Sequence, residues 1–127
     1  KATAVIKELE KSEGSILAFK ISAKVTLEEE RQWIQKFDNA LKKHDKISAL
    51  IILGEEASWG LKAGVEDIKW IMTHLDKLHR LALVTDSTVW KWLIKIDSPF
   101  AKMAGIGEKY FPLSELDDAW DWVKNKD

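Results

Sequence analysis

The side chains of this chain that could do chemistry are three histidines, a serine ahead of a helix and scattered carboxylates. His74 and His79 are five residues apart, whereas a metal-binding pair on a helix needs a spacing of four. Both, like His44, fall near expected helix ends or a strand start, where imidazole complements the helix dipole. Asp67 and Glu66 lie about two turns from His74, too far for a direct hydrogen bond. The histidines therefore predict neither a metal site nor a catalytic base.

Phosphate chemistry is also disfavoured. Gly54, Gly60 and Gly64 do not form a nucleotide-binding fingerprint. Glu55 and Glu56 stand in the loop before the second helix and would repel a phosphate at its N-terminus. The chain has no cysteine, which excludes thiol nucleophiles, disulfides and iron–sulfur clusters. We expect no catalytic residue, no metal and no cofactor, and therefore a protein that is not an enzyme.

Composition and charge narrow the class of protein further. The 127 residues fit one domain spanning 1–127, with 46% apolar and 32% charged residues. A net charge of −1 argues against a dedicated nucleic-acid binder. No apolar run approaches the roughly 20 residues that span a bilayer, and the beginning of the chain lacks a signal-peptide core. The expected location is cytoplasmic, with peripheral membrane contact left open.

Strands and helices are expected to alternate along the chain. Residues 3–8 and 15–23 read as an antiparallel hairpin, and Thr26 with Glu29 forms a capping box that begins a helix. The remaining expected strands cover 47–53, 81–84 and 109–111, and the remaining expected helices cover 60–77, 86–96 and a last helix capped by Ser114. Such alternation predicts an α/β fold with a mainly parallel sheet.

Seven tryptophans make the helix faces informative. In the second helix, the expected core stripe is Leu61, Val65, Ile68, Met72 and Leu75. Trp70 then falls about 200° from Ile68, on the outward face. Three interpretations stay open for Trp70: it packs under a neighbouring helix or loop of the same chain, it meets a partner subunit, or it lines a ligand site with Trp59 and His74.

The third expected helix carries more apolar residues than one sheet face can cover. Trp90 and Trp92 belong to an apolar arc of about 200°, and Phe100 follows soon after. This segment either packs against adjoining helices or forms an exposed patch for oligomerisation, a lipid or a membrane surface.

The run from Trp59 to Trp70, followed by His74, the strand 81–84, Trp90-x-Trp92 and Pro99-Phe100, resembles the SpoIIAA-like family. That family belongs with STAS domains and is related in fold to the lipid-carrying CRAL-TRIO (Sec14) domains. The resemblance implies a mixed, mostly parallel sheet of about five strands flanked by about four helices. It also implies an interaction module. In anti-sigma-factor antagonists a serine at the start of a helix is phosphorylated, and Ser58 lies in roughly that location.

The sequence thus favours a non-enzymatic binding module for a hydrophobic small molecule, a lipid or a partner protein, with a homodimer as one form. The expected contact residues are Trp59, Trp70, His74, Trp90, Trp92 and Phe100. The alternative is a regulatory switch protein of the anti-sigma-antagonist type, phosphorylated on Ser58. Ala57 stands where an aspartate usually precedes such a serine.

Overall fold

The computed structural model of the chain describes residues 6–9, 15–88 and 107–124. The strands are β1 (Ile6–Glu8), β2 (Ile16–Ile21), β3 (Lys24–Val25), β4 (Ile47–Leu53), β5 (Ser58–Trp59), β6 (Leu78–Val84) and β7 (Gly107–Phe111). The α-helices are α1 (Leu27–Leu41), α2 (Leu61–Thr73) and α4 (Leu116–Lys124), and 3₁₀ turns occupy Leu75–Lys77 and Leu113–Glu115. Trp90, Trp92 and Phe100 lie outside the described residues, as does most of the third expected helix.

Five of the strands form one mixed sheet in the order β1-β2-β4-β6-β7. β1 runs antiparallel to β2, and the other neighbouring strands run parallel. The predicted hairpin, the mostly parallel sheet and the α/β class are therefore confirmed. Three α-helices flank the sheet within the described residues, against the four or so that the resemblance implied.

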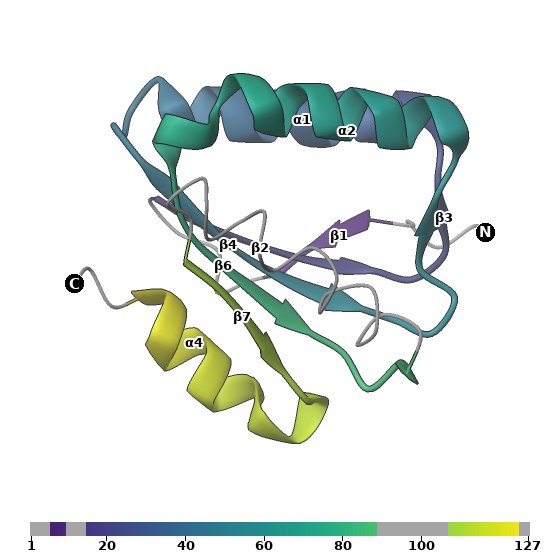
Figure 1. Cartoon of the computed structure of the whole chain (residues 1–127), viewed down its shortest axis with the longest axis vertical. Coiled ribbons are helices and arrows are strands. Elements are labelled where there is room, and N and C mark those ends of the chain that lie inside the picture. Colours follow the sequence, from purple (N-terminus) through teal and green to yellow (C-terminus); the bar gives the residue numbers. More distant parts are fainter. Residues whose placement is uncertain (1–5, 10–14, 89–106, 125–127) are drawn as a thin grey trace.

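Helices cover both faces of the sheet, as Figure 1 shows. α1 and α2 lie side by side over one face, and α4 lies under the other. The side chains of β4 are therefore enclosed from both sides, which is why its sequence is an apolar run interrupted only by Ser48. One core cluster packs under α1 and α2, around Phe19 and Ile21, and a second packs on α4, around Leu50 and Trp120.

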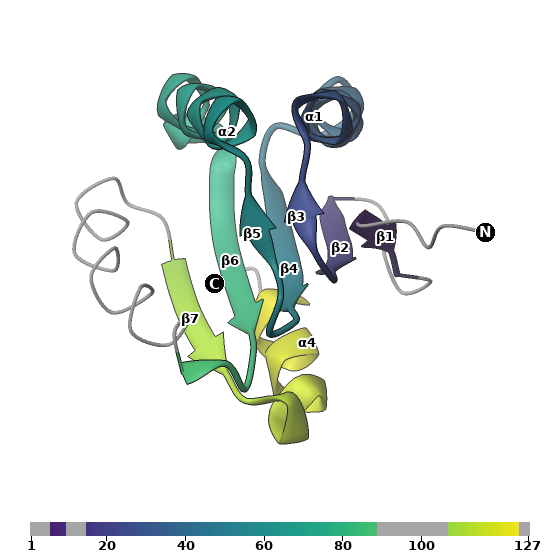
Figure 2. The same cartoon turned by 90° about the vertical axis from the view of Figure 1, so that its right-hand side faces the viewer.

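A second, two-stranded sheet was not predicted. β3 and β5 pair in parallel, with Lys24 opposite Ser58 and Val25 opposite Trp59 (Figure 2). Each strand has two residues, too few to produce a readable alternation. Gly60 follows directly, and its N–H donates to the carbonyl of Val25 at 3.0 Å. A Cβ at Gly60 would meet that same oxygen at 3.3 Å, so the close approach favours glycine.

The capping box predicts the start of α1 correctly. The Glu29 N–H donates to Oγ1 of Thr26, and Oε1 of Glu29 accepts from the Thr26 N–H. The helix buries Glu30, Trp33 and Phe37, which are spaced three and four residues apart. Its inward face is therefore set by aromatic residues that meet the sheet and α2.

The predicted orientation of α2 was wrong. Leu61 is 86% exposed and Val65 is 44% exposed, although both were placed in the core stripe. Ala63 is buried, and Trp70, predicted to face outward, packs against the core under α1. The error arose because α2 packs on α1 and also lies above the sheet. A helix with apolar residues on two sides does not reveal by periodicity alone which side faces the core.

Candidate functional site

The outer face of α2 carries the most exposed apolar side chains of the described residues. Leu61 and Val65 are four residues apart and therefore lie on one side of the helix, one turn above the other. The other large apolar side chain with comparable exposure is Leu113, at 43%, in the turn before α4. Leu61 and Val65 together are therefore the candidate contact surface on α2.

Trp70 belongs to the opposite, inner face of α2. Its indole Nε1 donates to Oδ1 of Asp38 at 2.8 Å, and its ring packs against Phe37 with centroids 5.4 Å apart. Both partners are on α1. Of the three interpretations of Trp70, the structure therefore supports packing under a neighbouring helix of the same chain.

His74 completes the same contact. Its ring stacks on Trp70 with centroids 4.2 Å apart and an interplanar angle of 14°. Nδ1 lies 2.7 Å from the carbonyl oxygen of Trp70, and Nε2 lies 3.9 Å from Oδ1 of Asp38. The acid that approaches His74 is thus Asp38, not the Asp67 or Glu66 weighed from the sequence. The ring is held as a packing element at the end of α2.

A pair of acids lies deeper between the two helices. Glu30 of α1 has no exposed surface, and a hydrogen bond joins its carboxyl group to that of Asp67 on α2. Burial raises the pKa of Asp67, and the hydrogen bond with Glu30 lowers it in part. A hydrogen bond between two carboxyl groups requires one proton, so the pair carries at most one negative charge when the bond is formed.

The sequence did not identify this pair. Glu30 is one of three consecutive acids in the first turn of α1, after Glu28 and Glu29. The available signal was its position three residues before Trp33 and seven before Phe37, which puts all three on one helix face. Because Glu30 is wholly enclosed, the pair joins α1 to α2 and does not form a substrate site.

Ser58 and Trp59 form β5, immediately before α2. Ser58 is exposed, and its N–H donates to the carbonyl of Ala23 at 3.4 Å. The backbone of Trp59 pairs with Val25, and its side chain lies outside the described part of the structure. The structure thus places Ser58 at the surface, immediately before α2.

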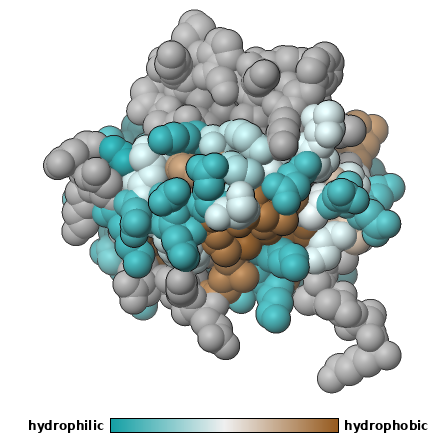
Figure 3. All heavy atoms as spheres, turned by 90° about the horizontal axis from the view of Figure 1, so that it is seen from below, coloured by the Kyte–Doolittle hydropathy of each residue, from teal (hydrophilic) through white to brown (hydrophobic). Residues whose placement is uncertain are grey.

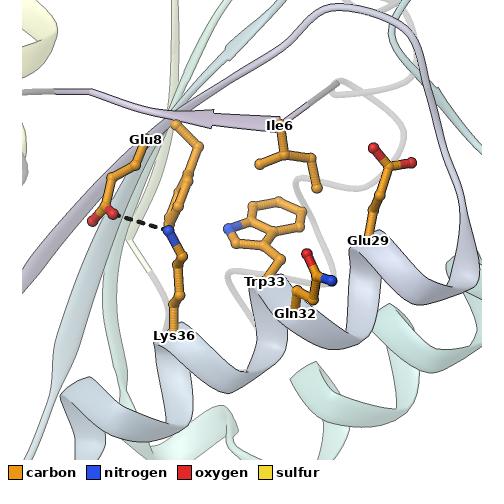
Figure 4. A pocket seen from close by; sticks show the side chains of 7 residues that line it. Ile6, Glu8, Glu29, Gln32, Trp33 and Lys36 are labelled. Carbon is orange, nitrogen blue, oxygen red and sulfur yellow. Dashed lines mark hydrogen bonds and ion pairs between the residues drawn. The ribbon is translucent and has the colours of Figure 1, made fainter. Parts of the chain in front are cut away.

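A small cavity opens at the edge of the sheet, between β1 and α1 (Figure 4). Its volume is about 150 Å³. It is lined by Ile6, Glu8, Phe19, Glu29, Gln32, Trp33 and Lys36. Sequence reasoning missed this cavity because its walls come from two strands and a helix that only the folded sheet brings together.

The α4 side of the molecule has apolar surface of its own. Figure 3 shows hydrophobic residues gathered in the middle of this mostly hydrophilic face. Leu9, Ile16 and Leu116 are the half-buried aliphatic residues that pack against the core on this side. None is as exposed as Leu61, so the outer face of α2 remains the stronger candidate.

Within residues 6–9, 15–88 and 107–124, no group of three histidine or acidic side chains could hold a metal ion. In the same part of the chain, no helix combines the length and apolar character needed to cross a bilayer.

Comparison with known proteins identifies the family. A search of curated proteins finds no match. Among solved structures, the chain is similar to an uncharacterized protein of the DUF3478 family from Shewanella loihica PV-4, which has a SpoIIAA-like fold. The two share 26% sequence identity and a TM-score of 0.71, over 93% of this chain and 91% of the other. The family model described as SpoIIAA-like matches residues 16–124. This chain therefore belongs to the SpoIIAA-like family.

Proposed function

We propose that this chain is a non-enzymatic binding module whose contact surface is the outer face of α2. The proposal rests on one observation, the exposure of Leu61 and Val65 on successive turns of that face. Covering apolar surface contributes roughly 25 cal/mol per Å², so burial of these two side chains favours a complex. The occupant is a hydrophobic small molecule or lipid, or the apolar surface of a partner protein, including a second copy of this chain.

The inner face of α2 supports the non-enzymatic part of the proposal. Trp70 and His74 are held against α1, and Glu30 is enclosed, so these groups serve packing. We therefore remove Trp70 and His74 from the proposed contact surface. Trp59, Trp90, Trp92 and Phe100 remain proposed contacts on the strength of the sequence alone.

Native mass spectrometry of the purified chain tests the proposal, because it reads bound mass and subunit number together. We expect either an extra mass of a few hundred daltons or a dimer, and we expect Leu61→Glu to abolish it. Since Leu61 is exposed, this substitution should change the free energy of unfolding by less than about 0.5 kcal/mol. Loss of binding would then not reflect loss of the fold.

Leu113→Glu is the matched control. It places the same charge at another exposed leucine, in the turn before α4 on the other side of the sheet. Binding or dimerisation should survive this change. A wild-type chain that is a bare monomer, or equal losses in both variants, would count against the outer face of α2 as the contact surface.

A regulatory switch is the second candidate function, favoured by the exposure of Ser58 immediately before α2. A phosphate there would add about −1.5 to −2 charges beside Leu61. Incubation with kinase-bearing extract, followed by peptide mass mapping, would detect the modification. If Ser58 stays unmodified while other serines react, this second proposal fails.

A further inference from the structure

The cavity between β1 and α1 has an aromatic wall and a polar rim. Trp33 and Phe19 form its inner wall, in edge-to-face contact with ring centroids 5.4 Å apart. Figure 4 shows Ile6 on the opposite side of the indole from the helix, with Glu8 and Lys36 to one side and Glu29 to the other. The rim therefore brings charged groups to two sides of one tryptophan ring.

The charges that line this cavity do not cancel. Nζ of Lys36 pairs with Oε1 of Glu8 at 3.1 Å, which neutralises one carboxylate. Glu29 is the second, and its Oε1 accepts hydrogen bonds from the Thr26 N–H at 3.0 Å and from Thr26 Oγ1 at 2.8 Å. These bonds orient the carboxylate without supplying a positive charge. Within the described residues, the lining thus carries one net negative charge.

Size and chemistry together select a ligand class. Aromatic faces attract cations, and tryptophan does so most strongly. A cavity of about 150 Å³ in another protein admits benzene, and drug-sized ligands need about 300 Å³ or more. A ligand that fits this cavity is therefore smaller than a drug molecule, and the lining favours one with both an apolar body and a positive charge.

We propose that this cavity binds a small organic ammonium group, with its apolar part against Trp33 and Phe19 and its charge held by Glu29. A free ammonium compound and a lysine or methyl-lysine side chain of a partner protein both present this chemistry. The site is separate from the outer face of α2, so its test is independent of the proposed function.

Choline and its neutral carbon isostere, dimethylbutanol, are the matched probes, since they differ in charge and hardly in shape. The indole N–H signal of Trp33 in heteronuclear NMR, assigned with Trp33→Phe, reports on the cavity. We expect choline to shift this signal saturably and to bind about fivefold more tightly than the isostere. Added salt should weaken the binding of choline but not that of the neutral isostere.

Two variants change the charge of the lining in opposite directions. Glu29→Gln keeps a side chain that can form the capping box but removes the charge, and should lower choline affinity about fivefold. Lys36→Gln removes the lysine that pairs with Glu8. The cavity lining then carries one more net negative charge, and choline affinity should rise. Glu28→Gln is the control, because Glu28 is exposed on the same turn and does not line the cavity.

The proposal is overturned if choline and the isostere bind equally, if neither shifts the Trp33 signal, or if Glu28→Gln weakens choline binding as much as Glu29→Gln. Acetylated trimethyl-lysine amide separates the two sources of the ligand. Tighter binding of this compound than of choline would indicate a partner's side chain, and weaker binding would indicate a free small molecule.

Discussion

Glu30 of α1 and Asp67 of α2 share a hydrogen bond between their carboxyl groups, in the seam where the two helices meet. Two acids in such a place make the stability of the fold depend on pH. Removing ionised groups from water is costly unless they are paired with an opposite charge.

The first prediction concerns this dependence. The pKa of Asp67 is raised by burial above its ordinary value of 3.8, so the folded chain holds its proton more tightly than the unfolded chain does. The stability gained from this is complete below pH 3.8 and is lost as the pH rises through the folded-state pKa. Asp67→Asn cannot ionise, and at pH 7 it should be more stable than wild type by roughly 1 kcal/mol.

Urea denaturation at a series of pH values measures this difference, which should shrink as the pH falls towards 4. Asp76→Asn is the control, because Asp76 is exposed in the turn after α2. Identical stability of wild type and Asp67→Asn at every pH would show that Asp67 ionises without cost in the seam.

The second prediction concerns the contact of Trp70 with α1. Trp70→Phe keeps an aromatic ring but removes the hydrogen bond to Asp38 and reduces the stacking on His74. We expect a loss of about 1–3 kcal/mol in the free energy of unfolding, measured by urea denaturation. Asp38→Asn keeps an acceptor oxygen and should cost much less. A Trp70→Phe variant as stable as wild type would contradict the packing role.

The third prediction separates the two faces of α2. Leu61→Ala removes an exposed side chain and should change stability by less than about 0.5 kcal/mol. Ala63→Leu adds volume at a residue that is only 1% exposed and should cost about 1–3 kcal/mol through overpacking. Thermal denaturation of both variants checks the orientation of the helix. The opposite ranking would restore the orientation predicted from the sequence.

The fourth prediction concerns the attachment of α4. Arg80 of β6 donates from one guanidinium nitrogen to the carbonyl of Trp122 at 2.7 Å and lies over its ring, 4.8 Å from the centroid. Arg80→Lys keeps the charge but loses the planar group. We expect a loss of about 1–2 kcal/mol and faster amide hydrogen exchange at the end of α4. Unchanged exchange would mean that α4 is held by its apolar face alone.

Patterns confined to one element were predictable from the sequence. The capping box of Thr26 and Glu29 begins α1, and the nearly continuous apolar run of β4 indicates a strand buried on both faces. The alternation of strands and helices gave the sheet, and the residues from Trp59 to His74 gave the family.

Relations between elements were not predictable in this way. The direction in which Leu61 points depends on how α2 sits on α1, and periodicity describes one helix alone. Asp67, the hydrogen-bond partner of Glu30, lies on another helix, and the residues around Glu30 do not predict this contact. The cavity under α1 likewise exists only once β1 and β2 pair. The sequence placed Trp70 on the outward face of α2, whereas Trp70 packs against α1.

The pairing of β3 with β5 affects how α1 and α2 unfold locally. This pairing connects the residues just before α1 with those just before α2, with Lys24 opposite Ser58 and Val25 opposite Trp59. The two helices also contact each other near their other ends, where Asp38 of α1 meets Trp70 and His74. A pair of helices tied at both ends unfolds most readily as one cooperative unit. Amide protons throughout α1 and α2 should therefore share one opening free energy, while α4, held separately, exchanges on its own.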